Sequence, residues 1–124
     1  MAQTVDLSDA EWRVMNVVWE RQPLLAQDVI QAVAEPCEWT PATVRTMLHR
    51  LVKKGALSFT EDGNRYLYRA AVKRADCVRR AARSFLDHVF RGDAAPLLSH
   101  YVRTAKFTPE ELAELRKLLD QQET

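Results

Sequence analysis

Residues 40–55 read TPATVRTMLHRLVKKG and carry both a start signal and a stop signal for one helix. Thr40 is suited to cap the helix, Pro41 has the backbone angle of a first helical position, and Gly55 is suited to end it. At 100° per residue, four apolar side chains gather on one side of this helix: Val44, Met47, Leu48 and Leu51. Polar and basic side chains gather on the opposite side. We therefore expect one buried face and one exposed, chemically distinct face.

After Gly55 the apolar period changes to two, which is typical of strands. Residues 57–60 (LSFT) and 66–69 (YLYR) form two short β-rich runs. The residues between them, 61–65 (EDGNR), contain the pair Asp-Gly, a strong signal for a hairpin turn. The helix at residues 40–55 is therefore followed by a predicted two-stranded wing.

Two further helices are expected before residue 40. Ser8 and Glu11 form a capping box that opens the first helix. Its apolar stripe consists of Trp12, Met15, Val18 and Trp19. The second helix follows Pro23, and its buried side consists of Val29, Ile30 and Val33. Residues 35–38 (EPCE) are expected to be a loop, because a proline disfavours the helical conformation of the residue before it.

The helical pattern resumes near residue 73 and continues in three segments. A long stripe ends near Arg91 and Gly92, a short apolar segment covers residues 96–102, and a capping box at residues 108–111 (TPEE) opens the last helix. The predicted fold class is mainly α. A winged helix-turn-helix domain of three helices and a two-stranded hairpin (residues 1–72) is followed by an α-helical dimerisation domain (residues 73–124).

The prediction of a dimer depends on the size of the second domain. About 50 residues in three helices rarely build an independent core, yet each helix has an apolar stripe that must be covered. We expect a homodimer in which these helices interlock; the alternative is that they fold back on the winged domain. The predicted interface consists of Phe85, Leu86, Val89, Leu97, Leu98, Tyr101, Leu112 and Leu115.

The net charge of +1 conceals an uneven distribution along the chain of 124 residues. Residues 40–74 hold eight basic and two acidic side chains, whereas residues 1–39 hold two basic and seven acidic ones. Residues 75–124 hold eight of each kind. The excess positive charge thus coincides with the third helix and the wing, which indicates a surface for a polyanion.

The exposed face of the third helix has the chemistry of a helix that reads the DNA major groove. Small side chains allow close approach, hydroxyl groups bond phosphates or bases, and an arginine bonds guanine or holds a phosphate. The predicted contacts with double-stranded DNA are Thr40, Ala42, Thr43, Arg45, Thr46, His49, Arg50 and Lys53, with Arg65 at the wing tip. The alternative for Arg45 and Lys53 is ordinary solvated charge. Tyr66 and Tyr68 are interpreted as packing groups of the hairpin.

Several other classes of protein are not supported by the sequence. It has no nucleophile elbow, no Gly-rich phosphate loop and no metal triad, so neither an enzyme nor a cofactor is expected. Cys37 and Cys77 lie far apart without a Cys-x-x-Cys motif, which predicts no metal site and no disulfide framework. His88 and His100 are expected to be structural or exposed. No long apolar run or leader pattern is present, so we expect a cytoplasmic protein without membrane insertion.

The sequence resembles the penicillinase repressor family, which comprises β-lactamase, methicillin-resistance and copper-responsive repressors. The resemblance covers nearly the whole chain, and residues 39–51 are its most specific part. It rests on residues 7–15 (LSDAEWRVM), 18–20 (VWE), 39–55 (WTPATVRTMLHRLVKKG), 66–68 (YLY), 83–87 (RSFLD), 96–98 (PLL) and 108–112 (TPEEL). It implies a dimeric bacterial repressor on a palindromic promoter operator, controlling β-lactam resistance or related genes.

The resemblance also implies regulation by proteolysis through a membrane sensor protease system. The scissile Asn-Phe pair of the family falls on His100-Tyr101, where the aromatic residue is kept in type and the asparagine is not. Leu25 stands where relatives often have a threonine cap, so a weaker cap on the second helix is expected. Copper sensing through a C-terminal Cys-x-Cys pair is not expected, because no cysteine follows Cys77.

A second function remains open from the sequence alone. Winged helices also serve as protein–protein interaction modules without any role in DNA binding. Such a module more often shows an exposed apolar patch where this chain concentrates its positive charge. The charge pattern therefore favours DNA, and the interaction module is the alternative.

Overall fold

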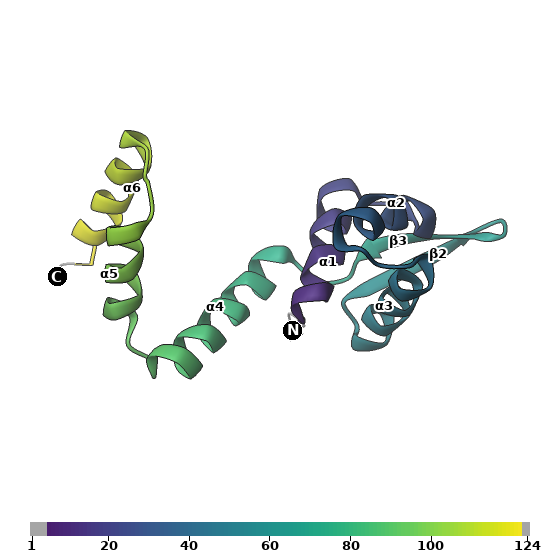
Figure 1. The fold of residues 1–124 in the computed structure, drawn as a ribbon, viewed down its shortest axis with the longest axis horizontal. Helices are drawn as coiled ribbons and strands as arrows, with labels where there is room; N and C mark the ends of the chain where they lie inside the picture. Colours follow the sequence, from purple (N-terminus) through teal and green to yellow (C-terminus); the bar gives the residue numbers. More distant parts are fainter. Residues whose placement is uncertain (1–4, 123–124) are drawn as a thin grey trace. The chain divides into compact units, whose positions relative to one another are not determined.

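The computed structural model describes residues 5–122. Residues 1–4, which belong to the stretch expected to carry no leader pattern, lie outside the described residues. The chain divides into two compact units, one ending at Ser84 and one beginning at Phe85 (Figure 1). The elements of the first unit are α1 (Asp9–Arg21), β1 (Leu24–Leu25), α2 (Ala26–Cys37), α3 (Pro41–Lys54), β2 (Leu57–Asp62) and β3 (Arg65–Ala70). Helix α4 (Arg74–Phe90) contributes to both units, and α5 (Ala94–Thr104) and α6 (Pro109–Asp120) belong to the second.

Helix α1 begins as the sequence predicts. The Ser8 hydroxyl accepts a hydrogen bond from the Glu11 N–H, and the Glu11 carboxylate accepts one from the Ser8 N–H, so the capping box is confirmed. Trp12 and Trp19 are half-buried, and their ring centroids lie 5.7 Å apart. The buried apolar residues of α1 are Val14, Met15 and Val18.

Helix α2 is longer than the sequence predicts. It continues through Pro36 to Cys37, so the prediction of a loop at residues 35–38 was wrong. The proline backbone angle is compatible with a helix, and in the last turn its missing N–H removes only one hydrogen bond. Glu38 then takes the left-handed conformation with φ 57°, and the Trp39 N–H donates to the Ala34 carbonyl oxygen at 2.8 Å. These bonds close the helix one turn later than expected.

The sheet has one more strand than the predicted two-stranded wing. Its order is β1-β3-β2, and β1 pairs antiparallel with β3, with Leu24 opposite Tyr68 and Leu25 opposite Leu67. A strand of two residues shows no alternation of its own and is defined only by its partner. The turn of the wing consists of Gly63 and Asn64, and Gly63 has φ 66°, which glycine adopts without strain.

The core of the first unit confirms the predicted winged helix-turn-helix. The predicted inner face of α3 is buried along its whole length. It packs in one cluster with buried side chains of α1, α2, β1 and β2, and with Val72 and Cys77 beyond the sheet. In Figure 1 the β2–β3 hairpin projects beyond α2 and α3, as a wing does.

The helices of the second half follow the predicted order, and α5 is longer than the segment predicted for it. Helix α4 ends at Phe90, directly before Arg91 and Gly92, which both have positive φ, and Thr108 and Glu111 form the predicted capping box of α6. The short segment predicted at residues 96–102 is the middle of α5, which Asp93 caps. Within residues 5–122, no helix combines the length and apolar character that crossing a bilayer requires.

Candidate nucleic-acid interface

Helix α3 is held by its cap and its inner face, which leaves the opposite face free. Thr40 Oγ1 accepts the Thr43 N–H at 3.1 Å and lies 2.9 Å from Thr43 Oγ1. Gly55 ends the helix with φ 86°, and its N–H donates to the carbonyl oxygens of Leu51 and Val52. The exposed face therefore has a fixed orientation relative to the core.

The structure brings most of the predicted DNA contacts together on α3. The exposed residues of its outer face include all eight predicted positions: Thr40, Ala42, Thr43, Arg45, Thr46, His49, Arg50 and Lys53. Some hydroxyl hydrogens are already engaged, because Thr46 Oγ1 donates to the Ala42 carbonyl oxygen at 3.0 Å. In the described part of the chain, no carboxylate pairs with Arg45, Arg50 or Lys53. Their charges are therefore available to a phosphate backbone.

The wing carries two further arginines, Arg65 and Arg69. Arg65 Nη2 lies 3.8 Å from Asp62 Oδ2, and both side chains are well exposed, so this ion pair holds Arg65 weakly. Arg69 Nη1 donates to Thr60 Oγ1 at 3.3 Å across the two strands. Arg65 thus lies where the sequence predicts, at the tip of the hairpin.

The aromatic residues of the wing pack against each other, in line with their interpretation as packing groups. Phe59 lies 4.5 Å from Tyr66 and 6.0 Å from Tyr68 between ring centroids. Phe59 and Tyr68 are directly opposite in the strand register. Burial raises the pKa of the Tyr68 hydroxyl, so that side chain stays neutral.

A hollow of about 230 Å³ lies between the wing and the first turn of α2. Leu25 is the N-cap residue of α2 and supplies no side-chain acceptor, in line with the weaker cap expected there. Instead the Asp28 carboxylate accepts the Leu25 N–H at 3.0 Å. The hollow is lined by Leu25, Ala26, Gln27, Asn64, Arg65 and Tyr66. It brings polar groups of α2 and of the wing tip together.

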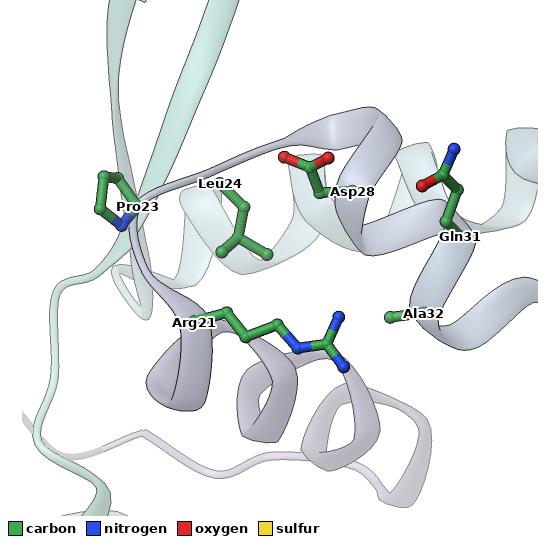
Figure 2. A pocket seen from close by; sticks show the side chains of 6 residues that line it. All are labelled: Arg21, Pro23, Leu24, Asp28, Gln31 and Ala32. Carbon is green, nitrogen blue, oxygen red and sulfur yellow. The ribbon is translucent and has the colours of Figure 1, made fainter.

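A second hollow, of about 370 Å³, lies beside α1 and α2 and is open to solvent (Figure 2). Arg21 lines it from α1, and Asp28 and Gln31 line it from α2. All three polar side chains are exposed, so the hollow lacks the buried polar group that would fix a ligand. We assign it no role.

Within residues 5–122, the cysteines and histidines form no cluster that could hold a metal ion. Cys37 is half-buried and Cys77 is buried, and both are free thiols. Burial raises the pKa of the Cys77 thiol, which lowers its reactivity at neutral pH. Among residues 5–122, no three His, Cys, Asp or Glu side chains come close enough to hold a metal ion.

The apolar stripes of the C-terminal helices are uncovered in the single chain. Helices α5 and α6 contain no buried residue. Of the eight residues predicted for the dimer interface, Phe85, Val89, Leu98, Tyr101 and Leu112 are exposed, and Leu86, Leu97 and Leu115 are half-buried. His100 and Tyr101 both lie inside α5, with their rings in edge contact at 5.7 Å.

Comparison with known proteins identifies the family. The sequence profile described as Penicillinase repressor matches residues 7–121. The chain belongs to the penicillinase repressor family. The resemblance inferred from the sequence motifs is thereby confirmed.

Characterised members of the penicillinase repressor family match over nearly their full length. The methicillin resistance regulatory protein MecI of Mammaliicoccus sciuri is 30% identical over 118 residues, which is 95% of this chain and 96% of MecI. The penicillinase repressor of Bacillus licheniformis is 30% identical over 121 residues, or 98% of this chain and 94% of that protein.

Solved structures of the penicillinase repressor family show the same fold. The DNA-binding domain of the repressor BlaI superposes with a TM-score of 0.55 at 36% identity, covering 61% of this chain and 93% of that domain. The monomeric form of Bacillus licheniformis BlaI in complex with the blaP half-operator gives a TM-score of 0.54 at the same identity and coverage.

Two features of the winged helix-turn-helix were not predicted from the sequence. The prediction did not place Gln27 and Asn64 beside Arg65, because the hollow joins residues from two distant segments. It also gave no special role to Lys54, whose partner Glu11 lies 43 positions away. The one available signal was Glu11 itself, because the carboxylate of a capping box needs a cation if the fold buries it.

Proposed function

We propose that this chain is a transcriptional repressor that binds a palindromic operator in double-stranded DNA as a homodimer. The observation that carries the proposal is the exposed face of α3, where Arg45, Arg50 and Lys53 have no acidic partner within residues 5–122. BlaI, a member of the same family, has been solved in complex with a half-operator, which supports DNA as the partner of this chain. Promoter DNA as the target also implies a cytoplasmic location.

In the proposed complex, α3 lies in the major groove. Ala42 permits close approach near the start of the helix, and Arg45 and Arg50 bond guanine or hold flanking phosphates. His49 contacts a base edge, and Lys53 holds a phosphate near the other end of the helix. Arg65 extends from the wing tip to the adjacent backbone or minor groove.

The second domain, residues 73–124, is proposed to form the dimer. Its apolar side chains are exposed in the single chain, which is unfavourable in water unless a second copy covers them. Two winged domains related by a twofold axis would contact two half-sites on one face of the duplex. Linking two weak half-site contacts in this way raises the overall affinity.

Regulation by proteolysis belongs to the same proposal. The bond between His100 and Tyr101 lies in α5, where the His100 carbonyl oxygen accepts the Thr104 hydroxyl and the Tyr101 carbonyl oxygen accepts the Ala105 N–H. A protease needs an extended strand, so cleavage here would require local unwinding of α5. Cutting this helix would remove interface residues, and the dimer would separate. The inducing system would be a β-lactam-sensing membrane protease.

The experiment that tests the proposed function is selection of bound duplexes from a random library by the full-length chain. The expected product is a palindrome with two half-sites about one helical turn apart or a multiple of it. The double variant Arg45→Ala/Arg50→Ala serves as a control for the face of α3. Failure to enrich any duplex would contradict the proposal and favour the protein–protein interaction module.

A further inference from the structure

Two consecutive lysines at the end of α3 have different surroundings. Lys54 Nζ lies 2.6 Å from Glu11 Oε1 and donates a second hydrogen bond, of 2.8 Å, to the Asp6 carbonyl oxygen. Lys53 is exposed, and among the described residues it has no such partner. The two charges therefore act differently, although they belong to the same basic segment.

The partner of Lys54 is a buried carboxylate. Glu11 is only 2% exposed, and its Oε1 also accepts the Ser8 N–H at 2.8 Å. Burial on its own raises the pKa of the Glu11 carboxyl. The hydrogen bonds from Lys54 and Ser8 outweigh burial and leave that pKa below its ordinary value. The ion pair is thus formed at neutral pH and joins the start of α1 to the end of α3.

The second carboxylate oxygen makes this pair costly to break. Glu11 Oε2 is buried and has no hydrogen-bond partner within the described part of the chain. Removing the cation from a buried charge is strongly destabilising, and a hydrogen bond has a preferred direction, whereas hydrophobic attraction has none. The two hydrogen bonds of Lys54, to Glu11 and to the Asp6 carbonyl oxygen, therefore add a directional constraint on the position of α3.

We propose that Glu11 and Lys54 are positioning residues for DNA reading, and that Lys54 is not a phosphate contact. The inference rests on the proposed function, because it assigns a role to the end of the helix that would read the DNA. The ion pair fixes the end of α3 against α1. Which bases lie opposite Arg45 and Arg50 then depends on this ion pair as well as on the apolar core.

The test compares Lys53→Gln with Lys54→Gln in the full chain. Binding is measured against the selected operator duplex and a scrambled duplex over a range of salt concentrations. Lys53→Gln should weaken binding to both duplexes by a similar factor and reduce the slope of log affinity against log salt by about 1. Lys54→Gln should leave that slope unchanged and lower the operator-to-scrambled affinity ratio several-fold.

Further variants keep the test informative if Lys54→Gln folds poorly. Lys54→Arg retains the charge and should restore most of the affinity ratio. Glu11→Gln should lower the ratio as Lys54→Gln does, and the double variant should lose less than the sum of the single losses. Circular dichroism at each salt concentration confirms that the compared variants are folded.

Two outcomes would overturn the inference in different ways. If Lys54→Gln reduces the salt slope as much as Lys53→Gln and leaves the affinity ratio unchanged, Lys54 is a phosphate contact. If the wild-type chain itself does not distinguish operator from scrambled duplex, the proposed function fails, and the positioning role fails with it.

Discussion

Trp19 and Val72 lie 53 positions apart in the sequence, and the indole Nε1 of Trp19 donates a 3.0 Å hydrogen bond to the Val72 carbonyl oxygen. This bond ties α1 to the connection between β3 and α4. Val72 is itself part of the buried cluster, so its carbonyl oxygen has little access to water. The bond therefore anchors the chain where the wing ends, before α4 begins.

Replacing Trp19 with phenylalanine should reduce the free energy of unfolding. The change leaves the Val72 carbonyl oxygen without a donor, which costs about 1–3 kcal/mol. Urea denaturation followed by circular dichroism measures the loss. Trp12→Phe is the matched control, because the Trp12 indole makes no hydrogen bond in the described part of the structure. Equal losses in the two variants would contradict the assigned role of the Trp19 bond.

Leu98→Glu should convert the proposed dimer to a monomer. Leu98 is 52% exposed in the single chain, so the substitution leaves the protomer folded but places a charge in the predicted interface. Sedimentation velocity at micromolar concentration checks the oligomeric state. Ser99→Glu, on the next position of the same helix, should sediment like the wild type. A wild-type chain that sediments as a monomer would remove the dimer.

The two thiols should differ in reactivity. Cys37 is half-buried, whereas Cys77 is 1% exposed and burial raises the pKa of its thiol. A thiol-specific disulfide reagent should therefore modify Cys37 in the native protein and Cys77 only after denaturant is added. Cys37→Ser should abolish the native reaction. Modification of both thiols at the same rate in the native state would contradict the burial of Cys77.

Acid should weaken the fold through Glu11. The carboxyl pKa of Glu11 lies below its ordinary value of 4.5 in the folded chain. The stabilisation is therefore present above that ordinary value and is lost as the pH falls through the folded pKa. Urea titrations between about pH 3 and pH 7, a range that includes values below and above the ordinary carboxyl pKa, check this dependence. Glu11→Gln should flatten it, and Glu20→Gln, an exposed carboxyl on the same helix, should not.

Much of the fold is predictable because its signals are local. The capping boxes at Ser8 and Thr108, the cap at Thr40 and the stop at Gly55 all involve residues within a few positions of each other. The two faces of α3 follow from helical periodicity in the same way. Local signals of this kind predict the structure correctly here because the tertiary contacts favour the same local conformation.

The features that escaped prediction depend on distant partners. Strand β1 has only two residues and is defined by its pairing with β3. Pro36 is the exception, because a local bond from the Trp39 N–H to the Ala34 carbonyl oxygen closes the last turn of α2. Lys54 looks like any other lysine of the basic segment until α1 brings Glu11 to it. Pairings of this kind are set by the tertiary arrangement and leave no local pattern.

The most direct test of the central claim is a fluorescence anisotropy titration of the wild-type chain with the selected operator and a scrambled duplex. The account predicts tight, salt-sensitive binding to the operator and weak binding to the scrambled duplex. Arg45→Ala and Arg50→Ala should each weaken operator binding by about 1–3 kcal/mol, and Arg13→Ala, an exposed arginine on α1, should not. Equal affinity of wild type and both α3 variants for the two duplexes would contradict the claim that α3 reads DNA.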